Sequence, residues 1–305
     1  MEKNKTLPAK TAQILRKRVK DLFKQRSCYK SSPSNPDQYL LEISDAEKQL
    51  LCSPLHSTDI TEFINFCSDV ITDGDIYLFG GIIRDLALFG PRAFNSDIDI
   101  VVDGDLTSLV PTLENHGAIK NKFGGYRLYI ENWPIDIWQA SETWAIKSGF
   151  VNYEGISSLI NTTVLNWDAI LMNWRTENFI FGEKYFQELQ SRSLKIILAK
   201  NPNPLGMLVR ILRHMCLKEA EKIDMESVKY LSAAVKKYNH TQISTYEMES
   251  YGSQEINRKI LDLLISVDTE SNEEEIDKIL FCDGESIIDS LIGQASLLKS
   301  PPNIH

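Results

Sequence analysis

Two aspartates stand two residues apart in a stretch that is otherwise typical of a buried strand. Asp97 and Asp99 alternate with Ile98 and Ile100. Because side chains alternate between the faces of a strand, both carboxylates are expected on one face. Two ionised carboxylates aimed at one place repel each other unless a cation lies between them. Mg²⁺ prefers carboxylate and phosphate oxygens, and pairs of such ions serve phosphoryl transfer, so the spacing points to metal and phosphate chemistry.

A third aspartate follows in a second apolar strand. Asp136 lies between Ile135 and Ile137 in the segment "PIDIW". An aspartate on an adjacent strand can complete a metal shell and accept the proton of an attacking hydroxyl. A lone D-x-D pair has a plainer interpretation, with Asp97 capping the strand and Asp99 facing solvent, because short motifs arise by chance. Acidic residues in two apolar strands favour the functional interpretation.

A glycine pair precedes these aspartates. Gly80 and Gly81 end one expected strand and open a helix at Ile82. Two glycines permit positive φ, and their N–H groups at a helix N-terminus suit an anionic triphosphate, although a simple turn is equally consistent with them. Arg84 has two open roles, contacting phosphate or pairing with a carboxylate to brace the turn. Asp85 is expected to be structural.

These residues resemble a known family. The segments "LFGGIIRDLALFG" and "NSDIDIVV" are similar to the signature that opens the CCA-adding enzymes and bacterial poly(A) polymerases. Those enzymes belong to the nucleotidyltransferase superfamily that includes DNA polymerase β. The resemblance extends over residues 74–220 and includes "YIENWPIDIWQA" around Asp136. It also includes "LNWDAILMNW", with Asp168 where the family usually has asparagine, and "NPLGMLVRILRH", which keeps Arg210 and Arg213.

The resemblance implies a reaction and a set of site residues. An NTP is bound with two Mg²⁺ ions, a hydroxyl attacks the α-phosphate, and pyrophosphate leaves. Asp97 and Asp99 would hold the metals, and Asp136 would join one metal and assist deprotonation. The nucleotide would be contacted by Gly80, Gly81, Arg84, Asp168, Arg210 and Arg213. The expected acceptor is the 3′ end of an RNA such as tRNA.

The chain also departs from the family pattern. An acidic pair that helps the CCA-adding enzymes read the nucleobase is replaced here by Gly206 and Met207, and Trp138-Gln139 stands where an arginine usually follows the third carboxylate. Three functions therefore stay open. They are an RNA 3′-end nucleotidyltransferase, a toxin or phage-defence transferase that modifies tRNA, a small molecule or a protein, and a degenerate RNA- or protein-binding module. The retained carboxylates count against the third.

The elements that must position these residues follow from hydrophobic periodicity. Strands are expected at 76–79, 97–102, 126–133 and 135–138, helices at 82–89, 106–116 and 164–174, and a final strand pair at 178–182 and 194–198. Beyond Pro204 the pattern is helical throughout. The sequence predicts an α+β fold, in which a small mixed-sheet nucleotidyltransferase head (39–203) follows a basic arm and linker (1–38) and precedes an all-helical domain (204–305).

Composition and charge restrict the class of protein and the cellular compartment that are expected. The chain has 305 residues, a net charge of −9 and no apolar run near the roughly 18–20 residues that span a bilayer. Its five cysteines are well separated, which favours a reducing cytoplasm over a disulfide framework. Residues 1–30 carry ten Lys and Arg against two acidic residues. This basic arm is expected to contact phosphates, to form a solvated helix, or to dock on the acidic remainder of its own chain.

Overall fold

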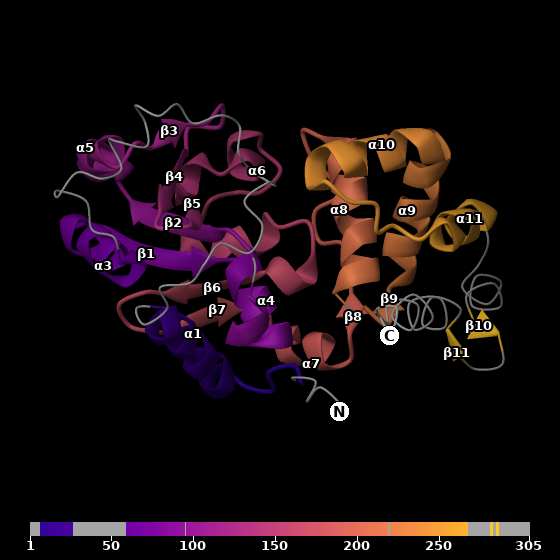
Figure 1. Ribbon diagram of the computed structural model, residues 1–305, viewed down its shortest axis with the longest axis horizontal. Coiled ribbons are helices and arrows are strands. Elements are labelled where there is room, and N and C mark those ends of the chain that lie inside the picture. The colour runs from indigo at the N-terminus through magenta and orange to yellow at the C-terminus, as the bar shows by residue number, and fades with distance from the viewer. Residues whose placement is uncertain are drawn as a thin grey trace, which may run out of the picture. The chain divides into compact units, whose positions relative to one another are not determined.

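The chain divides into two compact units. The computed structural model describes residues 7–26, 59–94, 96–218, 220–267, 281–282 and 285–286 (Figure 1). A sheet unit comprises residues 1–163 and 167–186, and a helical unit comprises 164–166 and 187–305. The predicted linker at 31–38 lies outside the described residues. A mixed sheet with flanking helices, together with a helical unit, confirms the predicted α+β class.

The sheet unit is built on seven strands in the order β3-β4-β5-β2-β1-β6-β7. Neighbours are antiparallel except β2 and β5, which run parallel. The strands are β1 (Gly74–Phe79), β2 (Ile98–Gly104), β3 (Ile119–Lys120), β4 (Tyr126–Ile130), β5 (Trp133–Gln139), β6 (Ile170–Asn173) and β7 (Phe179–Phe181). The strands predicted around the three aspartates are therefore present, and they lie side by side.

The two faces of the central strands differ in character. Ile98, Ile100, Ile135 and Ile137 are fully buried on one face, which is the alternation that the sequence predicts for a half-covered strand. Farther along β2, Val101 lies on the opposite face, in an apolar cluster with residues of β1, β6 and the segment after β5. The aspartates therefore share their face with a hydrophobic cluster that covers only the far part of the strands.

α-Helices and short 3₁₀ helices precede, connect and follow the strands. They are α1 (Ala12–Arg26), α3 (Ile60–Val70), α4 (Gly81–Phe89), η2 (Pro91–Ala93), η3 (Leu106–Leu109), α5 (Val110–Asn115), η4 (Ala140–Glu142), α6 (Trp144–Lys147), η5 (Ile156–Asn161), η6 (Asn166–Asp168) and α7 (Tyr185–Gln190). Helix α4, which follows the glycine pair, contacts β1, β2 and β6. The predicted helices at 82–89 and 106–116 are confirmed.

Helix α1 of the basic arm docks on the sheet unit. Leu15, Val19 and Leu22 are at most 1% exposed, and α1 contacts α4. Arg18 donates to the carbonyls of Leu86 and Ala87 at 3.0 and 2.7 Å, in the last turn of α4. For the described part of the arm, docking on its own chain is the interpretation that the structure confirms.

Two of the predicted elements are wrong. The expected helix at 164–174 is the short turn η6 followed by strand β6. All four residues of β6 are buried because the strand lies between β1 and β7, and a run buried on both faces has no period that separates strand from helix. The expected pairing of 178–182 with 194–198 does not occur. β7 pairs with β6, and Ser193–Leu194 (β8) pairs with Lys222–Ile223 (β9).

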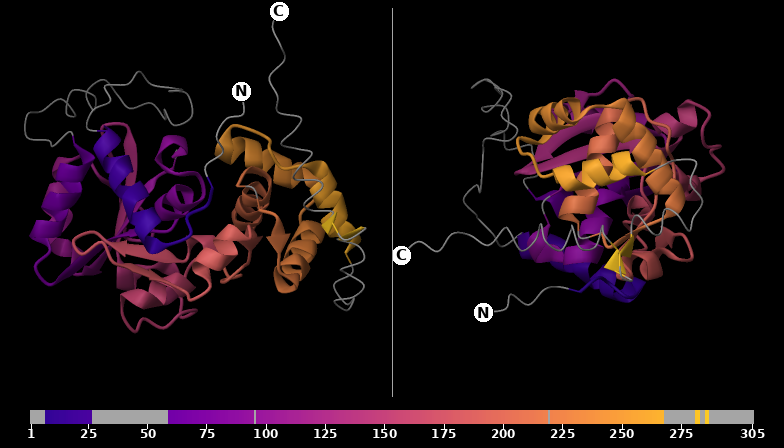
Figure 2. Two further views of the ribbon diagram at one scale, coloured as in Figure 1. Left: turned by 90° about the horizontal axis from the view of Figure 1, so that it is seen from below. Right: turned by 90° about the vertical axis from the view of Figure 1, so that its right-hand side faces the viewer.

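The helical unit contains four helices in its described part, drawn orange to yellow in Figure 2. They are α8 (Pro204–Leu217), α9 (Met225–Lys237), α10 (His240–Tyr251) and α11 (Arg258–Ser266). α8 contacts α9 and α10, and α9 contacts α11. Among the described residues beyond Pro204, the predicted helical pattern is interrupted by β9 and by the short pair β10 (Phe281–Cys282) and β11 (Glu285–Ser286). No helix in the described ranges of either unit is long and apolar enough to cross a membrane.

Candidate active site

The turn between β1 and α4 depends on glycine. Gly80 has a φ of 61°, in the left-handed region that a side chain makes costly. Its N–H donates to the Ile170 carbonyl of β6, and its carbonyl accepts from the Arg84 N–H, both at 3.0 Å. A Cβ placed on Gly81 would lie 3.4 Å from Ser96 Oγ. The glycine turn therefore lies beside the start of β2, where the aspartates begin.

The three aspartates lie at one face of the sheet. Asp99 of β2 is the register partner of Asp136 of β5, and partners on neighbouring strands point to the same face. Asp97 directly precedes β2, and its Oδ2 accepts from the Arg127 guanidinium that also bonds to Asp136, so its carboxylate lies beside the same face. Its side chain is 42% exposed and that of Asp136 is 24% exposed. Asp99 and Asp136 thus share a face of two adjacent strands, whereas Asp97, predicted inside the strand, stands just before it.

Arg127 of β4 connects two of these carboxylates. It is the register partner of Asp136, and its Nε and Nη2 donate to Asp136 Oδ1 and Oδ2 at 2.8 and 2.5 Å. The same Nη2 donates to Asp97 Oδ2 at 2.7 Å. Hydrogen bonding to Asp136, followed by the charges of Asp136 and Asp97, outweighs burial and raises the pKa of the Arg127 guanidinium. This guanidinium is a cation in direct contact with two of the predicted metal ligands.

The chemistry of the three aspartates fits a divalent metal. Carboxylate oxygens are the ligands that Mg²⁺ prefers, and adjacent strands present those of Asp99 and Asp136 on a single face. Within the described parts of the chain, no three Asp, Glu, His or Cys side chains are already gathered as a metal site. The positive charge in contact with Asp97 and Asp136 belongs to Arg127.

Arg84 is buried in an ion-pair cluster. Its side chain is 8% exposed; Nε donates to Asp85 Oδ1 at 2.8 Å, and Nη1 donates to Asp168 Oδ1. Burial lowers the pKa of Arg84, but the charges of Asp168 and Asp85 outweigh burial, and the pKa is raised. Of the two roles open for Arg84, pairing with carboxylates beside the glycine turn is the one that the geometry supports. Asp168, predicted as a nucleotide contact, is one of its partners.

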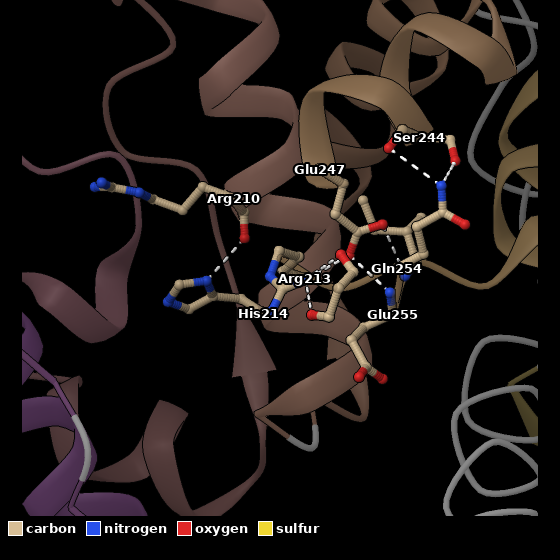
Figure 3. A network of polar contacts seen from close by, with 9 residues as sticks. Arg210, Arg213, His214, Ser244, Glu247, Gln254 and Glu255 are labelled. Atoms are coloured by element: carbon tan, nitrogen blue, oxygen red, sulfur yellow. Dashed lines mark hydrogen bonds and ion pairs between the residues drawn. The ribbon is translucent and has the colours of Figure 1, made fainter. Parts of the chain in front are cut away.

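Arg210 and Arg213 lie on α8 in the helical unit, and they differ in environment (Figure 3). Arg213 Nη1 donates to Glu247 Oε1 of α10 at 2.6 Å, and the guanidinium carbon lies 4.3 Å from the ring centre of Tyr251. Glu247 is 1% exposed and also accepts from the Glu255 N–H at 2.8 Å. Arg210 is exposed. Arg213 therefore joins α8 to α10, whereas the Arg210 guanidinium reaches solvent.

Arg127 and Glu247 are the polar residues that sequence reasoning missed. The sequence contained a signal for Arg127. A two-residue turn after Ile130 would pair Ile130 with Trp133 across the hairpin, and the same register would pair Arg127 with Asp136. The structure has this register, with Glu131 at a φ of 53° in the turn. The sequence instead favours a turn near Asn132–Pro134, between the expected strands 126–133 and 135–138. Glu247 lies in α10, within the region that is expected to be helical throughout, but the sequence analysis gave it no role.

Comparisons with known proteins give a match only among solved structures. Neither a family model nor a curated protein matches the sequence. The chain is similar to a tRNA-processing enzyme in its apo form (12% identity, TM-score 0.49, 78% of this chain and 63% of that one). It is similar to the Thermotoga maritima CCA-adding enzyme complexed with tRNA (15% identity, TM-score 0.48, 77% and 55%).

A third similar structure is a tRNA nucleotidyltransferase complexed with a primer tRNA and an ATP analogue (13% identity, TM-score 0.43, 79% of this chain and 84% of that one). This chain spans less than two thirds of the length of the first two enzymes.

Proposed function

We propose that this protein is a nucleotidyltransferase that transfers a nucleoside monophosphate from an NTP to a hydroxyl group. The observation that carries the proposal is the pairing of Asp99 with Asp136 across β2 and β5, with Asp97 beside the same face. The glycine turn lies beside the start of the same strand. In the reaction the hydroxyl oxygen bonds to the α-phosphorus, the bond from that phosphorus to its β-phosphate oxygen breaks, and pyrophosphate leaves.

The three aspartates are the proposed metal ligands. Mg²⁺ bound to Asp97, Asp99 and Asp136 would neutralise charge on the phosphate oxygens, and a pair of ions would serve the attacking and the leaving oxygen. Asp136 is also the proposed acceptor of the hydroxyl proton. Its side chain is partly exposed, so an acceptor substrate can approach it.

The residues around the glycine turn have two proposed roles, which are to maintain the turn and to contact the triphosphate. The Gly80 N–H is bonded to β6, so we assign Gly80 to shaping the turn. The Gly81 N–H lies in the first turn of α4, where backbone donors have no partner within the helix and suit the triphosphate. Arg84 and Asp168 brace this turn through their buried ion pair.

The arginines of α8 take different proposed roles. Arg210 is exposed and remains the proposed nucleotide contact of the helical unit, because a guanidinium suits both phosphate and base edges. Arg213 is held by Glu247, and we assign it to joining α8 and α10. A nucleotide contact from Arg213 would require breaking this buried pair, which is costly.

The proposed acceptor is the 3′ end of an RNA such as tRNA. This choice is supported by the sequence resemblance over residues 74–220, whose motifs belong to enzymes that act on RNA 3′ ends. Transfer to such an end requires a free hydroxyl near Asp136, an NTP over the glycine turn and the proposed metal ions. The identity of the added nucleotide would depend on residues of α8.

One observation favours a second candidate, a toxin or defence transferase that modifies tRNA, a small molecule or a protein. At the family's base-reading positions stand Gly206 and Met207. A Cβ on Gly206 would lie 2.5 Å from both Asn203 Nδ2 and Tyr246 Oη, so an acidic side chain does not fit there without rearrangement. Met207 is 3% exposed. The C-then-A choice of a housekeeping CCA enzyme therefore lacks its usual side chains.

A transfer assay tests the proposal. Purified protein is incubated with each labelled NTP, Mg²⁺ and total RNA, and labelled products are identified. We expect label from at least one NTP, and a loss of about 100-fold or more in Asp97→Ala and Asp99→Ala, because each removes a ligand of the charge-neutralising metal. Chelation of Mg²⁺ should abolish transfer.

Asp105→Ala is the matched control. It removes a carboxylate that caps the turn η3 beyond β2, outside the proposed site, and should transfer normally. Transfer that is unchanged in both Asp97→Ala and Asp99→Ala would remove the proposed mechanism. Growth arrest in cells that depends on Asp97 would favour the toxin over the RNA-processing enzyme.

A further inference from the structure

Arg127 lies among the proposed metal ligands although it is not one of them. It comes from β4, whereas Asp136 lies on β5 and Asp97 leads into β2. A single guanidinium atom, Nη2, is within hydrogen-bond distance of Asp97 Oδ2 and Asp136 Oδ2, at 2.7 and 2.5 Å. The carboxylates that would bind a metal are thus already joined through a cation of the protein.

The guanidinium and a divalent metal need the same oxygens. Two facing carboxylates require positive charge between them, and the planar fork of arginine supplies it with directed hydrogen bonds. A metal ligated by Asp97 and Asp136 would take up the lone pairs that now accept from Arg127. The two cations therefore exclude each other at these atoms.

The contact is open enough to be exchanged. The side chains of Arg127, Asp97 and Asp136 are 40%, 42% and 24% exposed, so solvent screens these ion pairs and can solvate the guanidinium when it leaves. The strand order places β4 and β1 on opposite sides of the β2–β5 pair. Arg127 and the glycine turn thus approach the carboxylates from opposite sides, and Arg127 can leave without any change in the turn.

We infer that Arg127 is an internal cation that competes with the divalent metal for Asp97 and Asp136. It sets the metal concentration at which the site fills, and it keeps the carboxylates in place while the site is empty of metal. This role rests on the proposed function, because it requires that these aspartates bind a metal. It makes Arg127 a positioning residue of that site.

Direct metal binding tests the role without measuring transfer. Mn²⁺ is titrated into the full chain, and free Mn²⁺ is followed by electron paramagnetic resonance. Arg127→Gln should bind Mn²⁺ roughly three- to tenfold more tightly than the wild type, because the competing hydrogen bonds are gone. Arg127→Lys keeps the charge but not the fork, and should fall between the two.

The controls separate failure of this inference from failure of the proposed function. Lys147→Gln removes a cation paired with Glu142 in the same unit and should leave Mn²⁺ affinity unchanged. If the wild type binds no more Mn²⁺ than Asp97→Asn does, both the proposed function and the competition are wrong. If the wild type binds Mn²⁺ and Arg127→Gln binds it equally or less well, only the competition is overturned.

A second measurement follows metal binding in the wild-type chain itself, with a variant used only to assign the resonance. The Nε–H resonance of Arg127, assigned by its absence in Arg127→Gln, is followed by nuclear magnetic resonance during addition of Mg²⁺. Loss of the bond to Asp136 should shift this resonance in step with metal binding. A resonance that stays in place while the metal binds would contradict the exchange.

Discussion

Burial separates the charged residues of the sheet unit into two kinds. Arg84 is 8% exposed and lies between Asp85 and Asp168, whose side chains are 2% and 14% exposed. Arg127 and Asp97 are each about 40% exposed. Removing one partner of a buried ion pair strongly destabilises the protein, whereas a part-exposed ion pair exchanges partners at little cost. The buried residues around Arg84 therefore maintain the glycine turn, and the part-exposed residues around Arg127 are available to a ligand.

Substitutions in the buried cluster should be unequal in effect. Arg84→Met leaves Asp85 and Asp168 without their shared cation and should lower the free energy of unfolding by about 3–5 kcal/mol. Asp168→Asn should cost much less, because the amide oxygen still accepts from Arg84 and Asp85 still supplies a charge. Urea unfolding followed by circular dichroism measures both. Equal losses in the two variants would contradict the proposed bracing role of Arg84.

The sequence predicted individual site residues unevenly. Asp97, Asp99 and Asp136 were apparent because a charged residue in an apolar strand stands out against its neighbours. The partner of Asp168 was not apparent from the sequence, because the segment "NWDAI" shows only that a carboxylate replaces the asparagine that is usual in the family. The structure supplies the reason that the carboxylate is tolerated, namely that Arg84 lies within bonding distance of it.

At the scale of the strands, the pairing register determines which side chains form the site. β4 and β5 are joined by a two-residue turn, and β5 then pairs in parallel with β2. A slip of one residue in either pairing would send one set of polar side chains to the face that buries Ile98 and Ile135. The apolar face therefore fixes the register, and the register aligns Arg127, Asp136 and Asp99 across three strands.

The glycine turn offers a prediction at the same scale. Gly80→Ala places a Cβ on a residue with a φ of 61° and should lower the free energy of unfolding by about 1–2 kcal/mol. Gly182→Ala is the matched control, because a Cβ there has no neighbour within 4 Å and its φ is not positive. Thermal or urea unfolding compares the two. A loss in Gly182→Ala as large as that in Gly80→Ala would argue against strain at the turn.

Elements were predictable where one face is buried and the other is not. The strands around the aspartates and the helix after the glycine pair show clear alternation or helical period, and the structure has them. β6 was missed because its residues are buried on both faces. The pairing of β8 with β9 joins segments separated by α8, and no local pattern reports a contact between such distant segments.

For the whole molecule, the basic N-terminal segment is part of the fold in its described portion. Lys20 pairs with Glu177 at 2.7 Å, and Arg16 donates to the Glu177 carbonyl at 3.1 Å. Phe23 lies edge-on to Trp174, with ring centres 5.0 Å apart. The positive charge of this segment is thus partly used within the chain, which reduces what remains for an RNA phosphate.

Removal of the apolar anchor of α1 should therefore destabilise the sheet unit. Leu15 is fully buried, and Leu15→Ala should lower the free energy of unfolding by about 2–5 kcal/mol. Ile14→Ala on the same helix is the control, because Ile14 is 42% exposed and should change stability by less than about 0.5 kcal/mol. Denaturant unfolding measures both. If Leu15→Ala is neutral, α1 is not an integral part of this unit.

The parallel pair β2–β5 has a consequence for the order of folding. It joins two antiparallel groups of strands, β3-β4-β5 on one side and β2-β1-β6-β7 on the other. Asp99 belongs to one group and Asp136 to the other, and a parallel pairing between distant segments closes a longer loop than a hairpin does. Each group can form while the aspartates are still apart. A ligand that needs both carboxylates would then bind only after the two groups have joined, and its binding would stabilise that junction against local opening.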